Sequence, residues 1–483
     1  MYTVRFQLEL SGSEKRFLSK SFFYANQMHN QLVRYATNRL NALFHDTEYV
    51  GARKTYGKAD FSKKKGSELS ASEKKKKKEL SNIMCIKQKE YNLTKTSMCK
   101  FVSKEQKKYK NYINSHQAQA EAEAVYKGVV KQKCAITGVR LSRWDTICFM
   151  KHYYKVRIPK NEYIQSIISS VDLKEDVVYS FLKRIEFNSG FKYYVVITLR
   201  GDAPKRIKLS EDGGHRTGVD FGTSTIATVS NNEVHLEELA PDSVNYEKEI
   251  RHKQNLVDAS MRKHNPENYN KNGTVKKGKH KWKTTRRCRR LKRQIRVLYR
   301  KQSAYIKTSH HTFINRVVQN TSEFILEPMN FKALQKKSKK TERKDEATAV
   351  KQKDGSFKMV RKYKRKKRYG HSIKNRSPGL MQTDLKTKAT QYGIPYYEID
   401  IHQYRASQLH HDTGEYIKPT LNERFKTVEG CKVQRDLYSA FLIYHTDDTL
   451  TAPDFEACHF DFPHFVKMQD TLLSLIHISE PTR

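Results

Sequence analysis

The sequence predicts a mixed α/β protein with added helical and β-rich modules, and three observations support this. Residues 2–10, YTVRFQLEL, alternate apolar and polar side chains, as a half-buried strand does. Residues 11–44 begin with the capping box SGSE and continue as a long amphipathic helix. Residues 377–400 form a helix that starts at Ser-Pro-Gly and is capped by Gly393, followed by the strand-like segment IPYYEID. A helix followed by a strand in this way is typical of a mixed α/β sheet.

Charge points to the class of partner. The chain has 483 residues, with 94 Lys and Arg against 51 Asp and Glu, so its formal net charge is +43. Such an excess repels itself unless a polyanion neutralises it, so nucleic acid is the expected partner. The densest helical stretch is 281–301, KWKTTRRCRRLKRQIRVLYRK. A calmodulin-binding or membrane-surface helix shares these features, but in so basic a chain contact with a nucleic-acid backbone is favoured. The candidate contacts are Arg286, Arg287, Arg289, Arg290 and Arg293.

Other broad classes are disfavoured. No run of about 18 apolar residues exists, so the sequence predicts no membrane span. The first ten residues lack the apolar core of a signal peptide. The seven cysteines are scattered and form no CxxC pair, which fits a reducing, cytoplasmic setting.

Composition changes along the chain suggest modules. Residues 11–130 are mainly helical, with a last helix expected at 107–131, and residues 131–210 contain several strand-like runs. If those runs pair with the N-terminal strand, the helical part is an insertion. A long helical region is expected at 243–320. Residues 335–370 are low-complexity and basic, and we interpret them as a flap that substrate orders.

Three acids lie where apolar elements end or begin. Asp220 is inside the strand–turn–strand pattern TGVDFGTSTIATVS, Glu327 follows the apolar run FIL, and Asp436 lies at the start of the helical pattern in VQRDLYSAFLI. An acid within an apolar strand is costly to bury unless it is paired or holds a cation. Carboxylates gathered from distant strand and helix ends would suit a two-metal nuclease, in which two Mg²⁺ ions activate water and stabilise the leaving oxygen.

Each acid also has a plainer interpretation. Asp220 alone suits a turn cap, Glu327 a water-exposed strand end, and Asp436 an ion pair with the adjacent Arg435. The three patterns together favour the nuclease interpretation.

The motifs around the acids resemble a known family. GVDFGTSTIATVS is similar to the first RuvC-like motif of transposon-encoded TnpB proteins and the compact type V CRISPR effectors derived from them. FILEPMNFKAL resembles their second motif and QRDLYSAFLI their third, in the same order, over residues 210–445. The resemblance implies that Asp220, Glu327 and Asp436 are catalytic and hold two Mg²⁺ ions. It also implies a RuvC (RNase H-like) nuclease lobe and a recognition lobe made of a β-barrel wedge domain and a helical bundle.

The resemblance implies the following domain layout. We expect a first wedge strand at 1–10, a helical recognition domain at 11–130, the β-rich part of the wedge at 131–210, a RuvC-like domain at 211–403, a target-nucleic-acid-binding loop at 404–432, the third RuvC-like motif at 433–447 and a tail at 448–483.

One departure from the family concerns zinc. The family usually carries two CxxC pairs between the second and third motifs, and this chain has none there. His410, His411 and Cys431 lie where ligands would fall but make an incomplete set, so zinc is not expected. A metal-free nucleic-acid-binding loop is favoured instead, with Lys418 and Arg424 as candidate contacts.

The family resemblance implies RNA-guided cleavage of double-stranded DNA, in which a guide RNA pairs with one strand and the protein recognises a short flanking motif. Candidates for that recognition are Tyr91, His116, Gln117 and Gln119, although an ordinary polar helix face explains the last three more simply. Two alternatives remain: an RNA-guided DNA binder that represses without cutting, and a protein-only nuclease or transposase with the same fold.

The last eleven residues, LSLIHISEPTR, fit neither the basic composition nor the architecture. They look like translated sequencing-adapter read-through, and we expect the native chain to have been lost from somewhere after about Tyr444.

Overall fold

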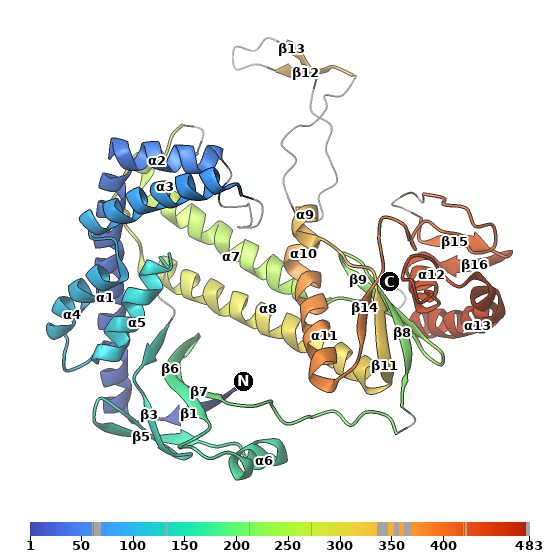
Figure 1. The fold of residues 1–483 in the computed structure, drawn as a ribbon, viewed down its shortest axis with the longest axis horizontal. Coiled ribbons are helices and arrows are strands. Elements are labelled where there is room, and N and C mark those ends of the chain that lie inside the picture. The colour runs from blue at the N-terminus through green and yellow to red at the C-terminus, as the bar shows by residue number, and fades with distance from the viewer. Residues whose placement is uncertain are drawn as a thin grey trace. The chain divides into compact units, whose positions relative to one another are not determined.

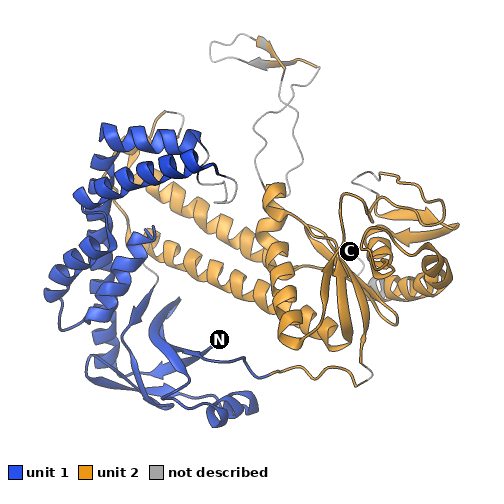
Figure 2. Cartoon of the chain, in the orientation of Figure 1, with its two compact units in different colours: residues 1–204 blue, residues 205–483 orange. Residues whose placement is uncertain are grey.

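The computed structural model describes residues 1–59, 61, 69–130, 134–211, 213–271, 273–335, 346–351, 357–361, 370–418, 420 and 423–479. The chain divides into two compact units, residues 1–204 and 205–483 (Figure 2). Among the described residues, none of the helices combines the length and apolar content that crossing a membrane requires.

The first unit is built around a seven-stranded antiparallel sheet with the strand order β2-β6-β7-β1-β5-β4-β3. Its strands are β1 (Tyr2–Glu9), β2 (Ala135–Thr137), β3 (Arg140–Arg143), β4 (Thr146–Phe149), β5 (His152–Arg157), β6 (Val177–Phe187) and β7 (Gly190–Leu199). β1 pairs with β5 on one side and β7 on the other. The expected pairing of the N-terminal strand with the β-rich module is therefore confirmed, and the helices between them are an insertion.

The inserted helices are α1 (Gly12–Leu43), α2 (Thr47–Lys58), α3 (Ala71–Glu90), α4 (Lys95–Lys107) and α5 (Ser115–Tyr126), and α6 (Glu162–Ser170) follows β5. The capping box is present. The Ser11 hydroxyl accepts a hydrogen bond from the backbone N–H of Glu14, and the Glu14 carboxylate accepts one from the backbone N–H of Ser11. The single helix expected at 107–131 is wrong. α4 ends at Lys107, and α5 begins later because the Asn114 side chain caps its first turn.

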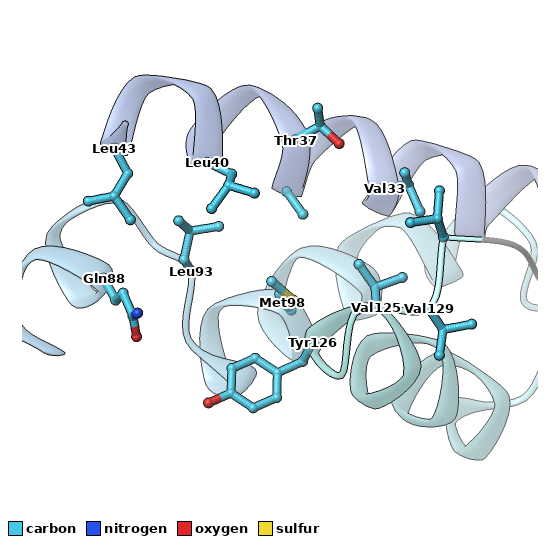
Figure 3. Close-up of a pocket in the computed structure, with 13 residues that line it drawn as sticks. Val33, Thr37, Leu40, Leu43, Gln88, Leu93, Met98, Val125, Tyr126 and Val129 are labelled. Carbon is cyan, nitrogen blue, oxygen red and sulfur yellow. The ribbon is translucent and has the colours of Figure 1, made fainter. Parts of the chain in front are cut away.

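An apolar pocket of about 490 Å³ lies in this helical region, between α1 and the segments that pass beneath it (Figure 3). Leu40, Leu93, Met98 and Val125 are among its lining side chains, and the pocket carries no acid. It is a gap in apolar packing and does not have the polar groups of a catalytic site.

The second unit has a five-stranded mixed sheet with the order β10-β9-β8-β11-β14. These strands are β8 (His215–Phe221), β9 (Thr225–Ser230), β10 (Val234–Glu238), β11 (Thr321–Leu326) and β14 (Tyr396–Glu398). β8, β9 and β10 form antiparallel hairpins, whereas β11 runs parallel to both β8 and β14. The mixed α/β fold expected from the sequence is confirmed.

The helices of this unit are α7 (Ser243–His264), the short 3₁₀ helix η2 (Pro266–Asn268), α8 (Arg286–Gln319), α9 (Phe331–Gln335), α10 (Gly370–Arg376), α11 (Pro378–Tyr392), α12 (Arg435–Tyr444) and α13 (Phe455–Ser479). Two small hairpins pair β12 (Thr348–Lys351) with β13 (Phe357–Val360), and β15 (Phe425–Val428) with β16 (Cys431–Gln434). The helical region expected at 243–320 is two helices. Asn265 and Asn268 hold the irregular segment between them, because their side-chain amides donate to backbone carbonyls of Lys283 and Lys281.

Helices cover both faces of the five-stranded sheet, so this unit has three layers (Figure 1). On one face Val219, Phe221 and Leu326 pack against α8 and α11. On the other face Ala227 and Ile325 pack against α12 and α13. Alternate residues of each strand therefore belong to different cores. Cys458, Phe462 and Phe465 of α13 are buried in the second core, so this part of the expected tail belongs to the fold.

Most of the basic flap expected at 335–370 lies outside the described residues. Within that range the structure describes β12, β13 and the two ends of the segment.

Candidate active site

Strand register brings two of the three acids together. In the parallel pair β8–β11, Val219 is opposite Leu326. The next residues are Asp220 and Glu327, so the two acids lie side by side where both strands end. Residues opposite each other on neighbouring strands point to the same face. Val219 and Leu326 point to the face covered by α8 and α11. Asp220 and Glu327, one residue further along, therefore point to the opposite face, which α12 covers.

A glycine in β8 lets α12 approach closely. A Cβ at Gly218 would lie 2.3 Å from the carbonyl oxygen of Ala440 and 2.4 Å from the backbone nitrogen of Tyr444. Gly218 and Asp220 are two residues apart on a strand and share a face, while Ala440 and Asp436 are one turn apart on a helix. The close contact at Gly218 therefore places the first turn of α12, with Asp436, over Asp220.

Several polar contacts orient Asp436. Arg435 donates from Nε and Nη2 to Asp436 Oδ1 at 3.3 and 3.1 Å, and the Thr225 hydroxyl donates to Oδ2 at 3.3 Å. Gln434 caps α12 by accepting from the backbone N–H of Leu437, and its own N–H donates to Gln469 of α13. The ion pair between Arg435 and Asp436 expected as the plainer interpretation is thus present, and it is part of the site.

The electrostatics of the site favour a cation. Burial, together with the negative charges of Glu327 and Asp436, raises the pKa of Asp220 well above its usual range, although Arg435 opposes this shift. Burial also raises the pKa of Glu327. Ionised carboxylates that are buried close together repel one another. A bound cation offsets that repulsion, so such a site favours cation binding.

The donor set fits magnesium. All three side chains offer only carboxylate oxygens, which Mg²⁺ prefers. Their oxygens do not all lie within 4.8 Å of one another; among the described residues only a different group of three possible ligands does. Wider spacing is compatible with ligands shared between two ions, which lie about 4 Å apart in two-metal sites.

The five predicted arginines, Arg286, Arg287, Arg289, Arg290 and Arg293, all lie exposed in the first turns of α8. Lys418 and Arg424 are exposed on the loop before α12. These positions leave their charges accessible to a nucleic-acid backbone, and their role in binding stays a prediction.

The candidates for flanking-motif recognition fall into different surroundings. His116 and Gln119 are exposed on α5 and line the same hollow. Gln117 is 2% exposed; its amide donates to Glu121 and its carbonyl accepts from the backbone N–H of Thr137. Its polar atoms are thus hydrogen-bonded within the fold, which disfavours the predicted role of Gln117 in base recognition. Tyr91 donates from its hydroxyl to Asp46, which joins α3 to the start of α2.

Sequence reasoning missed two residues of the site and one buried cation near Arg435. Gly218 and Thr225 lie within the first motif, but only the packing of α12 reveals what they do. The buried cation is Lys426: it is 9% exposed and donates to the carbonyl of Ser407. Burial, with a further contribution from Arg435, lowers the pKa of Lys426 to about 8. Lys426 and Val428 face inward in β15 while Phe425 and Thr427 are exposed, and the order of polar and apolar residues in FKTV gives no signal of this.

Comparison with known proteins gives limited guidance. No protein-family model matches the chain, and no curated protein matches it. Among solved structures, the chain resembles the protein of a Cas12f1–sgRNA–target DNA complex, with 13% identity and a TM-score of 0.38 over 88% of this chain and 82% of that one. It also resembles a CRISPR-Cas12f ternary complex, with 11% identity and a TM-score of 0.28 over 92% and 86% of the two chains.

Proposed function

We propose that this protein is an RNA-guided DNA endonuclease that cuts with a single RuvC-like, Mg²⁺-dependent site formed by Asp220, Glu327 and Asp436. The observation that carries the proposal is their convergence on one face of the sheet, together with the raised pKa of Asp220. Structural acids rarely gather in this way, because mutual repulsion and burial both oppose it.

The chain's own groups suit phosphodiester hydrolysis. When bound, Mg²⁺ supplies an activated water and stabilises charge on the leaving oxygen. Asp220 and Glu327 supply carboxylates from rigid strand ends, which limits their movement. Arg435 and Thr225 hold Asp436 in place from two sides. Arg435 also lowers the local negative charge, which favours the approach of a phosphate.

Two features support an RNA guide. The net charge of +43 exceeds what binding a short DNA site requires, and a bound RNA would neutralise much of it. The sequence motifs around the three acids also resemble those of RNA-guided nucleases. The alternative of a guided binder that does not cut would be expected to lack one of the acids, and all three are present here.

The test is to purify the protein expressed with its native flanking DNA and to sequence the RNA that co-purifies. The complex is then incubated with a plasmid target library and Mg²⁺. Asp220→Asn removes one site charge with little change in shape, and Asp258→Asn, at an exposed position of α7, is the matched control.

We expect a discrete RNA with a variable end, cleavage by the wild type and by Asp258→Asn, and none by Asp220→Asn. Cleavage without a discrete RNA would leave a protein-only nuclease. A discrete RNA with no cleavage by the wild type would leave the guided binder.

A further inference from the structure

A second cluster of possible metal ligands lies beside α12, next to Tyr438. It joins His411 in the loop after β14, Glu429 in the turn between β15 and β16, and His459 in the first turns of α13. One ligand atom from each lies within 4.8 Å of the others. His459 Nδ1 is 2.5 Å and His411 Nε2 is 3.2 Å from Glu429 Oε1. The carboxylate therefore lies between two imidazoles contributed by separate segments.

His411 is buried, and one of its ring nitrogens lies near the Glu429 carboxylate. The residue is 2% exposed, and its Nδ1 lies 2.8 Å from the Tyr438 hydroxyl, which also accepts the backbone N–H of His411 at 3.0 Å. Its Nε2 is buried and faces the Glu429 carboxylate at 3.2 Å, in an orientation that does not meet the geometry of a full hydrogen bond. Buried polar atoms normally have a partner, so this nitrogen requires an explanation.

The contact to Tyr438 resembles the support that metal-ligating histidines have. Such a histidine binds the ion through one nitrogen, while the other is hydrogen-bonded to a fixed group. Here Tyr438 engages Nδ1, which leaves Nε2 directed into the cluster. A cation placed between Nε2 and the Glu429 carboxylate would satisfy both.

Glu429 is held in an unusual backbone conformation. Its φ is 46° and that of Gly430 is 74°, as in the tight hairpin turns that favour Asn, Asp or Gly at the first of these positions. The backbone N–H of Glu429 donates to Asp412, the neighbour of His411. This bond ties the turn to the loop and keeps the Glu429 carboxylate near the two imidazoles.

We propose that His411, Glu429 and His459 bind one Zn²⁺ ion. Two imidazoles and one carboxylate form a donor set typical of zinc, with a remaining position open to water, whereas Mg²⁺ prefers oxygen ligands alone. Of the incomplete set considered from the sequence, His411 belongs to this cluster and His410 and Cys431 do not, while His459 lies beyond the third motif.

The ion would join three segments: the loop that carries His411, the β15–β16 hairpin and α13. The loop and the hairpin belong to the region 404–432 that we expect to contact nucleic acid. The site also touches α12 through Tyr438, two residues after Asp436. Zinc would thus hold this region against the helix that carries a catalytic acid. The inference goes beyond the proposed function and does not depend on it.

The experiment is a Zn²⁺ titration of the full-length protein after EDTA treatment and dialysis, by calorimetry, with Co²⁺ absorption as a second probe of the site. The variants are Glu429→Gln and His459→Asn. Glu456→Gln is the control, since it removes the same charge from an exposed position near His459 on α13.

We expect the wild type and Glu456→Gln to bind one tight equivalent of Zn²⁺ and to show the visible Co²⁺ bands of a low-coordinate site. Each ligand variant should weaken that equivalent by at least about tenfold, since loss of even an outer partner costs about 10–100-fold. Zn²⁺ should also raise the melting temperature of the wild type but not that of the ligand variants, whose metal-free melting temperatures show whether they fold.

Equal Zn²⁺ affinity in the wild type and both ligand variants would overturn the proposal, and so would a wild type without a tight equivalent. The cluster would then be a hydrogen-bonded histidine–carboxylate group. Asp220→Asn should keep the tight Zn²⁺ equivalent while losing cleavage, so failure of this inference and failure of the proposed function are distinguishable.

Discussion

Replacing Gly218 by Ala tests whether close packing of α12 on β8 positions the active site. The added Cβ would lie 2.3 Å from the carbonyl oxygen of Ala440, whereas ordinary contacts begin at 3.4 Å. The helix must therefore retreat by about 1 Å, because the three nearest atoms that the Cβ meets all belong to the backbone and cannot rotate away. Overpacking of this kind costs about 1–3 kcal/mol of unfolding free energy.

The same displacement separates Asp436 from Asp220. A misplacement of about 1 Å in a catalytic constellation can lower the rate about 100-fold. We therefore expect Gly218→Ala to lose about 1–3 kcal/mol of unfolding free energy and most of its Mg²⁺-dependent cleavage. Urea unfolding and single-turnover cleavage of a plasmid target measure the two effects.

Gly57→Ala is the control. A Cβ at Gly57, within α2, meets nothing within 4 Å, and in a helix the change stabilises by about 1 kcal/mol or less. Wild-type stability and cleavage in Gly218→Ala would refute the inference that this contact sets the position of Asp436.

Three further predictions concern charge and capping. Asp220→Asn should be more stable than the wild type at pH 7 in metal-free buffer, because burial and neighbouring charges raise the pKa of Asp220 in the fold. The gain should shrink as the pH falls and vanish below about 3.8, where Asp220 is protonated in the unfolded chain too; urea unfolding at several pH values measures it, and a gain that persists at pH 3 would contradict this account. Replacing Arg289 and Arg290 together by Ala should reduce the slope of log affinity against log salt for duplex DNA by about 2, as each lost phosphate contact removes about 0.9. Filter binding between low and moderate salt tests this, and an unchanged slope would place these arginines away from the backbone. Ser11→Ala should cost about 1 kcal/mol by removing the capping box of α1, measured by urea unfolding against Ser13→Ala; equal effects of the two changes would argue against the cap.

The sequence by itself determined the local elements and the chemistry of the site. The capping box at Ser11 and the Pro-Gly pattern around α11 act within a few residues, so their structures can be read from neighbours along the chain. The acids were visible because an ionisable residue at the end of an apolar strand is costly unless it has a purpose. The break between α4 and α5 was missed, although Asn114 is a residue type that often begins a helix by capping its first turn.

Only the tertiary structure decided which groups meet. Asp220 and Glu327 become neighbours through strand register, and Asp436 joins them because Gly218 has no side chain to hold α12 away. The burial of Gln117 and the meeting of His411 with two distant ligands likewise depend on long-range packing. Contacts between residues far apart in sequence follow from register and core packing, which side-chain periodicity along one segment does not encode.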